Sequence, residues 1–116
     1  MKFYKLIALF SAILLTQACG ENKASETTNK TTETFKVWGN CDMCKETIEG
    51  SLKVDGISKA DWNSDTDIMT VNFDSDKISI DQIHSKIAAV GYDTDKHKAD
   101  DKVYSGLPEC CQYERK

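Results

Sequence analysis

A short strand, a pair of thiols and a helix follow one another in residues 35–57, which read FKVWGNCDMCKETIEGSLKVDGI. Phe35 and Val37 alternate with Lys36, which is the period-two pattern of a strand with one buried face. From Cys44 onward, apolar side chains recur at every fourth residue and so share one face of a helix. The thiol pair is therefore predicted to lie at a strand-to-helix turn.

The periodic sequence after this turn predicts a hairpin, a second helix and a last strand. Two extended stretches, 57–62 and 69–73, flank a turn-rich segment and form the hairpin. Ser79 is a candidate N-cap for the second helix, which Gly91 ends, and residues 92–98 supply an edge strand. The order of elements predicts an α+β ferredoxin-like βαββαβ sandwich, with two helices on one face of a four-stranded antiparallel sheet.

Three further segments are expected outside this unit. Residues 1–18 have a basic start, an apolar run and a small polar end, which is the layout of a secretory signal peptide. The apolar run is much shorter than the about 20 residues that cross a bilayer. Residues 19–34 contain no large apolar side chain and are expected to form a flexible linker. We place the folded domain at 35–98 and a Cys-containing tail at 99–116.

The tripeptide Ala18-Cys19-Gly20 resembles the cleavage box of bacterial lipoproteins, in which the Cys becomes the acylated first residue. The box usually has an aliphatic residue three positions before the Cys, where this chain has Thr16. We expect Cys19 to be lipidated and to hold the protein on the membrane surface at the periplasmic side of the cell envelope. A soluble periplasmic form with an ordinary Cys19 thiol is the alternative.

The charge balance bears on the partners of the exported protein. Cleavage before Cys19 removes Lys2 and Lys5, which leaves 13 of the 15 basic side chains against 19 acidic ones, a net charge of −6. An acidic protein lacks the basic surface that binds nucleic acid or an anionic bilayer. We therefore expect no nucleic-acid partner.

Cys41 and Cys44 are the candidate metal ligands, because a two-residue spacer lets both sulfurs face one ion. The unpaired N–H groups at a helix start favour the thiolate form, and thiolates prefer Cu(I), zinc and heavier soft ions to magnesium or calcium. Two protein ligands leave a tetrahedral zinc ion half coordinated, whereas they satisfy Cu(I). Cu(I) is therefore the preferred ion, with Zn(II), Cd(II) and Hg(II) as alternatives.

Four sequence features are a C-x-x-C after the first strand, a helix over 45–54, VDGI at 54–57 and VGY at 90–92. Together they resemble the heavy-metal-associated domain family, which includes copper chaperones, metal-binding domains of P-type ATPases and the periplasmic mercury-binding protein. The resemblance covers about residues 35–98. It implies that Cys41 and Cys44 bind the ion and that Tyr92 lies near the metal loop.

The metal loop departs from the family pattern in one respect. The family commonly has Gly-Met-Thr or Gly-Met-Asp before the first Cys, whereas this chain has Trp38-Gly39-Asn40. Met43 lies instead within the C-x-x-C spacer, where it could face solvent, pack down or offer a weak thioether to Cu(I), and we expect it to pack. Its neighbour Asp42 is a candidate for stabilising a divalent ion or a docking surface, although an exposed acid needs no role.

Cys110 and Cys111 are further candidate ligands on a tail that the family resemblance does not cover. A mobile tail could fold back over Cys41 and Cys44 and bring three or four sulfurs together, which favours zinc, cadmium or a closed Cu(I) site. The alternative in an oxidising compartment is a disulfide, either between Cys110 and Cys111 or with one of the first two thiols.

The remaining aromatic and imidazole side chains give weaker signals. His84 and His97 stand in polar sequence and are expected to be solvated surface residues. Trp38 and Trp62 are expected to pack at the edge of the core.

The function predicted from these features is that of a metal carrier or scavenger, for which no catalysis is needed. Its partners would be a soft metal ion and a metal-efflux or metal-delivery protein that takes the ion by thiolate exchange. A thiol-disulfide oxidoreductase is the main alternative, because C-x-x-C at a helix start is also a redox motif. The only proline, Pro108, lies outside the core and cannot face the thiols there, which argues against that enzyme. A permanently oxidised structural pair is a third alternative, but so short a loop adds little stability.

Overall fold

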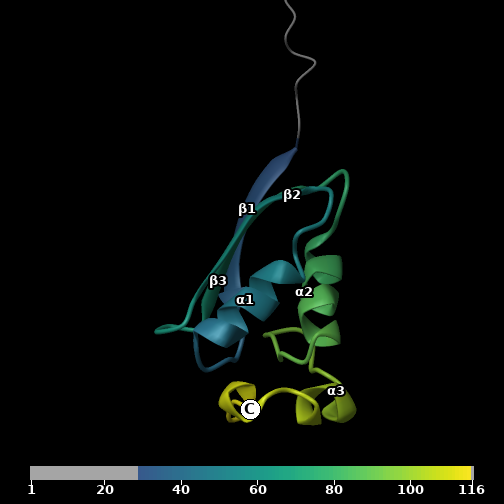
Figure 1. Cartoon of the computed structure of the whole chain (residues 1–116). Helices are drawn as coiled ribbons and strands as arrows, with labels where there is room; N and C mark the ends of the chain where they lie inside the picture. The colour runs from purple at the N-terminus through teal and green to yellow at the C-terminus, as the bar shows by residue number, and fades with distance from the viewer. Residues whose placement is uncertain (1–28, 116) are drawn as a thin grey trace, which may run out of the picture.

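The computed structural model describes residues 29–115, in which a three-stranded antiparallel sheet carries two helices on one face (Figure 1). The elements in chain order are β1 (Lys30–Lys36), α1 (Asp42–Gly50), β2 (Ile57–Asn63), β3 (Ile68–Asp74), α2 (Ile80–Ala89), α3 (Asp101–Ser105) and the 3-10 helix η2 (Glu109–Cys111). The predicted signal peptide and the predicted lipidation site Cys19 lie outside these residues.

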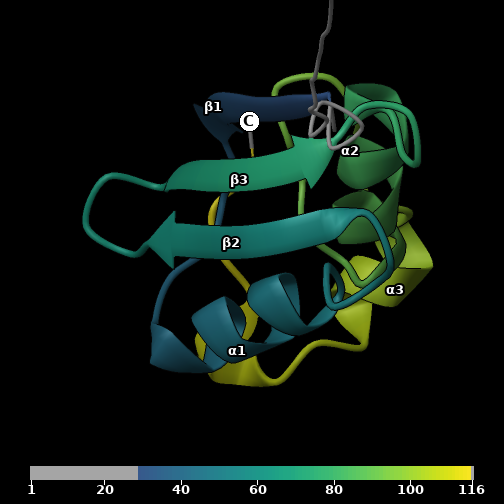
Figure 2. The ribbon, with the colours of Figure 1, turned by 90° about the horizontal axis from the view of Figure 1, so that it is seen from above.

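The sheet is built around β3, which pairs antiparallel with β1 on one side and β2 on the other (Figure 2). Along β3, Met69, Val71 and Phe73 are buried while Thr70 and Asn72 are half-buried. This alternation turns one face of the sheet toward the helices and leaves the other to solvent. The predicted β2–β3 hairpin is confirmed.

Both main helices bury one apolar face against the sheet. The buried side chains of α1 are Cys44 and Ile48, and Ser79 caps α2 as the sequence predicts. The Ser79 hydroxyl accepts the Gln82 N–H at 3.1 Å, while the Gln82 side chain accepts the Ser79 N–H at 2.9 Å, which is a complete capping box. Helix α1 runs from Asp42 to Gly50 rather than over 45–54, so Cys44 lies inside its first turn.

A four-stranded sheet is not confirmed in the part of the chain that the structure describes. The predicted edge strand over 92–98 is reduced to a single bridge between Val37 and Thr94. After this bridge the chain turns, because the Thr94 N–H donates to the His97 carbonyl at 2.7 Å and the Thr94 hydroxyl accepts the His97 N–H at 3.0 Å. A hydroxyl that bonds nearby backbone groups competes with strand pairing in this way.

The structured region also extends beyond the predicted domain of 35–98 at both ends. Strand β1 begins at Lys30, within the segment expected to be a linker. This part of the strand has no apolar side chain, but its three Thr residues are β-branched and therefore favour extended structure. At the other end, residues 99–115 pack against the domain and bury Cys111 and Tyr113. We call residues 99–115 the C-terminal strap.

Across residues 29–115, no helix combines the length and apolar character that a membrane crossing requires.

Candidate metal centre

The two thiols of the C-x-x-C motif lie where the loop after β1 enters α1. Cys41 has extended backbone geometry and is the N-cap of α1, and Cys44 follows in the first turn. Their sulfur atoms are 3.9 Å apart. Cys44 is buried, whereas Cys41 is half-buried and therefore accessible to an incoming ion or thiol.

Trp62 of β2 fixes the backbone of this loop from beneath. Its ring is fully buried, and its indole N–H donates to the Val37 carbonyl at 2.9 Å. Gly39 lies directly on the ring, because a Cβ atom there would come within 2.8 Å of it. Trp62 therefore lies within the core rather than at the edge where it was expected, and it sets the path of the chain into the thiol site.

Lys45 joins the start of α1 to the same strand. Its ammonium donates to Glu49 at 2.6 Å, to Asp61 at 2.9 Å and to the Trp62 carbonyl at 2.7 Å. Charge-assisted bonds of this kind are stronger than neutral ones, so the helix that carries both thiols is held against β2 by several contacts.

The C-terminal strap brings a third thiol to the pair. The sulfur atoms of Cys41, Cys44 and Cys111 all lie within 4.8 Å of one another, and Cys111 is only 2% exposed. We call these three residues the thiol cluster. The tail therefore lies over the C-x-x-C motif, which is the arrangement expected if the tail supplies a further metal ligand. The four Cys residues of the described part are free thiols, and no disulfide joins them.

Cys110, the neighbour of Cys111, lies at the exposed edge of the thiol cluster. It is exposed, and its sulfur lies 3.4 Å from the sulfur of Met43 and 4.0 Å from that of Cys111. Met43 is itself 53% exposed, so the expectation that it packs into the core is wrong. It lies in the first turn of α1, next to the buried Cys44, with its side chain exposed to solvent.

The two thiols of the motif have different acidities. The backbone N–H groups of Cys44 and Met43 lower the pKa of the Cys41 thiol, as expected at a helix start. Burial raises the pKa of the Cys44 thiol, although the Asn40 N–H donates to its sulfur at 3.4 Å. Cys41 is therefore the thiol that ionises more readily.

Tyr92 is a completely buried neighbour of Cys44 and Cys111, in agreement with the expectation that it lies near the metal loop. Burial, followed by the neighbouring Cys111 and Cys44 thiols, raises the pKa of its phenol. Its hydroxyl is buried and makes no hydrogen bond of acceptable geometry within residues 29–115. A buried hydroxyl beside two sulfurs is well placed to donate to a thiolate.

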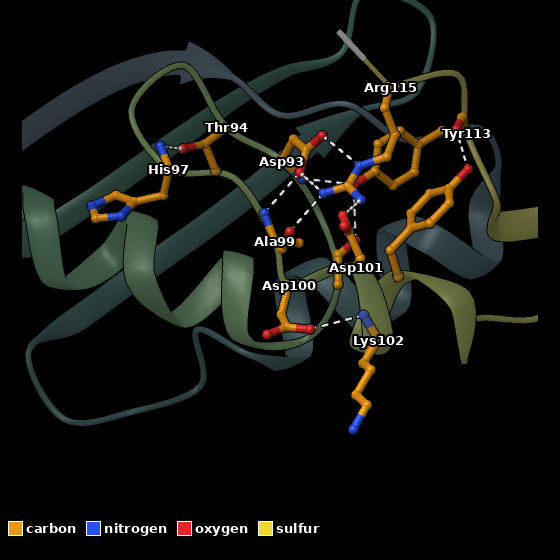
Figure 3. Close-up of polar contacts among 11 residues, drawn as sticks. Asp93, Thr94, His97, Ala99, Asp100, Asp101, Lys102, Tyr113 and Arg115 are labelled. Atoms are coloured by element: carbon orange, nitrogen blue, oxygen red, sulfur yellow. Dashed lines mark hydrogen bonds and ion pairs between the residues drawn. The ribbon is translucent and has the colours of Figure 1, made fainter.

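The strap is held in place by contacts around Asp93, which Figure 3 shows in close-up. The Arg115 guanidinium donates to both Asp93 oxygens, at 2.8 and 3.0 Å, and to the Ala99 carbonyl at 2.6 Å. The Tyr113 hydroxyl accepts the Asp93 N–H and donates to the Gly91 carbonyl, both at 2.8 Å. These bonds join the end of the strap to the segment that carries Tyr92.

Neither histidine belongs to the thiol cluster. His84 was expected at the surface, but it is 1% exposed, and its Nδ1 lies 2.6 Å from the Thr94 hydroxyl. Burial is the main cause that lowers the pKa of His84 to about 4. His97 remains half-exposed and lies 2.8 Å from Asp81.

The family model of the heavy-metal-associated domain matches residues 34–93, which hold both Cys41 and Cys44. The chain belongs to this family. Copper chaperone CopZ of Staphylococcus saprophyticus is 41% identical to it over 64 residues, which cover 53% of this chain and 94% of the chaperone. The heavy-metal-associated domain thus accounts for the β1–α2 unit and ends before the C-terminal strap.

Solved structures give the same assignment for the fold. Oxidized MerP from Ralstonia metallidurans CH34 is 32% identical with a TM-score of 0.54, over 59% of this chain and 99% of MerP. A putative copper-ion-binding protein from Bacillus anthracis is 26% identical with a TM-score of 0.56, over 59% of this chain and 99% of that protein. The heavy-metal-associated domain of this chain therefore has the ferredoxin-like arrangement of its relatives, with the fourth strand reduced to one bridge.

Proposed function

We propose that this protein binds Cu(I), or a similar soft ion, through Cys41 and Cys44 and passes it to a metal-efflux or metal-delivery protein by thiolate exchange. The observation that carries the proposal is the pair of sulfur atoms 3.9 Å apart at the start of α1. Two thiolates at this spacing can bind one soft ion, and the printed name of the relative, copper chaperone, is in keeping with Cu(I).

The two thiols have complementary roles in such an exchange. Cys41 is half-buried and the more acidic thiol, so it is suited to meet the incoming ion or the thiol of a partner. Cys44 is buried and anchored by the Asn40 N–H, so it is suited to retain the ion while Cys41 exchanges. Stepwise replacement of one sulfur at a time keeps the ion bound throughout the transfer.

We place this activity in the cell envelope, with Cys19 as the lipid anchor. The support is the signal-like composition of residues 1–18 and the small residues around Cys19. Palmitate labelling of cells that express the wild-type chain and Cys19→Ala tests this: the label is expected only in the wild type, and equal labelling of both would contradict the anchor.

Metal binding is tested by competitive titration of the reduced full chain with Cu(I) and Zn(II). The chain carries Cys19→Ser, so that only the four thiols of the described part remain. We expect tight Cu(I) binding that Cys41→Ser and Cys44→Ser each weaken severely, while Cys110→Ser, the exposed matched control, retains it. Unchanged Cu(I) affinity in both of the first two variants would overturn the proposal, as would robust insulin reduction by the metal-free protein.

A further inference from the structure

We propose that Cys111 is a third ligand and converts the C-x-x-C pair into a closed three-thiolate site. The inference rests on the proposed function and concerns the number of sulfurs that hold the ion. Its geometric basis is that the Cys111 sulfur lies within 4.8 Å of the sulfurs of both Cys41 and Cys44. One soft ion at the centre of this triangle can reach all three sulfurs after small side-chain adjustments.

The structure distinguishes Cys111 from its neighbour Cys110. In a 3-10 helix, consecutive side chains point about a third of a turn apart, so the two thiols of this vicinal pair extend in different directions. Cys111 is 2% exposed and faces the C-x-x-C motif, whereas Cys110 is exposed and contacts Met43. The peptide unit of Cys110 contributes instead through its carbonyl, which accepts the Asn40 side-chain amide at 3.3 Å.

One buried ion pair, between Asp93 and Arg115, fixes the strap in the position that presents Cys111. The Asp93 carboxylate is completely buried and the Arg115 side chain is 16% exposed, so both charges have lost most of their water. A desolvated pair of this kind contributes little net stability, and its best-attested use is to specify one arrangement over others. Here the arrangement it specifies brings the strap back over the metal loop.

Tyr92 provides a second observation that points to bound thiolates. Its buried hydroxyl has no hydrogen-bond partner within residues 29–115, which is rare and calls for an explanation. The hydroxyl lies beside Cys44 and Cys111, the two buried members of the thiol cluster. Donation to a metal-bound thiolate would satisfy it and would act as the outer hydrogen bond that metal ligands usually receive.

Three sulfurs favour some soft ions over others. Zinc in structural sites takes four ligands, whereas among residues 29–115 the three sulfurs of the thiol cluster lie within 4.8 Å of one another and the nearby Cys110, with its sulfur 4.0 Å from that of Cys111, is exposed. Cu(I) accepts sulfur ligands in low coordination numbers, so a closed trigonal site suits it. Such a site retains its ion more firmly than an open pair, with Cys41 as the one accessible point of exchange.

The test compares two neighbouring cysteines in the reduced full chain that carries Cys19→Ser. Cu(I) affinity is measured by competition with a chromophoric chelator, and Cd(II) is added separately to read the thiolate charge-transfer absorbance. Cys111→Ser is expected to lower Cu(I) affinity by at least about tenfold, because the loss of a hydrogen-bond partner of a metal ligand already costs that much. The same variant should lose about a third of the charge-transfer absorbance, since one of three thiolates is removed. Cys110→Ser is expected to change neither.

The result that overturns the inference is equal behaviour of Cys111→Ser and the parent chain. Loss of binding in Cys41→Ser and Cys44→Ser alone would then leave the proposed function intact, so the two failures are distinguishable. Because Cys111→Ser removes a buried side chain, X-ray absorption of the parent chain with one bound Cu(I) gives an independent count of sulfur ligands. Three sulfurs support the inference, and two overturn it.

Discussion

Tyr92 is the residue whose energetics depend most directly on the thiol cluster. Its buried hydroxyl has no partner within residues 29–115, and such a group costs about 1–3 kcal/mol relative to a satisfied one. Its ring stacks on Tyr113, with centroids 5.6 Å apart, so the side chain is held in place independently of the hydroxyl. A substitution that removes the hydroxyl and keeps the ring can therefore measure the effect of the hydroxyl alone.

Tyr92→Phe is expected to act in opposite directions on stability and on metal affinity. The metal-free variant should be as stable as the parent or more stable by about 1 kcal/mol, because an unsatisfied buried hydroxyl is removed while the ring remains. Cu(I) affinity should fall by about 10–100-fold, because the thiolates lose an outer donor. Thermal unfolding and chelator competition measure the two effects, and an unchanged Cu(I) affinity would refute the role of the hydroxyl.

His84 makes the stability of the fold depend on pH. Burial lowers its pKa to about 4, with Lys96 and His97 as smaller contributors and Asp95 and Asp81 acting against them. The unfolded state therefore binds the proton first as the pH falls, so stability should decrease from about pH 6.5 to about pH 4, by at most about 3 kcal/mol.

Urea unfolding at a series of pH values checks the loss attributed to His84. The variant His84→Gln should flatten the curve in this window. Burial raises the pKa of Asp93, but the Arg115 guanidinium and the Ala99 N–H together outweigh burial and hold this pKa below its usual value of 3.8. The stability that the Asp93 carboxylate contributes is therefore lost only below about pH 3.8, outside the window. A parent chain with constant stability between pH 6.5 and 4 would contradict the assignment.

At the scale of elements, the loop between β1 and α1 is the part that the fold controls most closely. Gly39 leaves no room for a side chain above Trp62, and the indole N–H bond to Val37 keeps the ring from moving away. A change at this position must therefore be absorbed by the loop, which leads directly to Cys41.

Gly39→Ala is expected to destabilise the protein by about 1–3 kcal/mol, the range for overpacking a well-filled site, and to weaken metal binding by displacing Cys41. Gly50→Ala is the matched control, because a Cβ there meets no atom within 4 Å and α1 gains helix propensity of up to about 1 kcal/mol. Urea unfolding and Cu(I) competition on both variants test the pair. Similar effects of the two substitutions would contradict the packing argument.

Sequence patterns predicted the elements that depend on local periodicity and missed those that depend on distant contacts. The C-x-x-C turn, the β2–β3 hairpin and the Ser79 cap each follow from residues close in sequence. His84 also had a local signal, since it stands four residues after Ile80 and three before Ile87 on the buried face of α2. His84 was nevertheless predicted to lie at the surface, because the residues next to it in sequence are polar.

The position of Cys111 could not be predicted from local sequence. Cys110 and Cys111 are the same residue type and are adjacent in sequence, so the sequence does not show which of them is buried. The contact of the strap with the metal loop decides it. One signal was present: Tyr104, Leu107 and Tyr113 give the segment apolar surface that a mobile tail does not need. The start of β1 was also not predicted, because its residues are polar and show no alternation of apolar and polar side chains.

At the scale of the whole molecule, the Asp93–Arg115 pair joins the strap to the rest of the chain. Asp93 lies between Tyr92 and the bridge at Thr94, so the pair links the strap to the core side of the thiol cluster. Arg115 also stacks on Tyr104, 4.6 Å from the ring centroid, which ties the end of the strap to α3.

Arg115→Gln is expected to destabilise the protein by about 3–5 kcal/mol, because it leaves the buried Asp93 carboxylate without its cation. It should also release the strap, so that Cys111 reacts with a thiol reagent much faster than in the parent chain. Lys98→Gln, which removes an exposed cation from the same region, should change neither quantity. Urea unfolding and timed alkylation with mass spectrometry give the two readouts, and slow alkylation of Cys111 in Arg115→Gln would count against the role of the pair.

The return of the strap to the metal loop also has a consequence for the order of folding. The bond between Asn40 and the Cys110 carbonyl joins residues 70 positions apart, whereas the β2–β3 hairpin closes within a few residues. Because the entropy of closing a loop rises with its length, the hairpin and the helices should form first and the strap should dock last. Each newly folded molecule would then pass through a stage in which Cys41 and Cys44 already face each other without Cys111. An ion that arrives during this interval meets a two-sulfur site and is enclosed when folding ends.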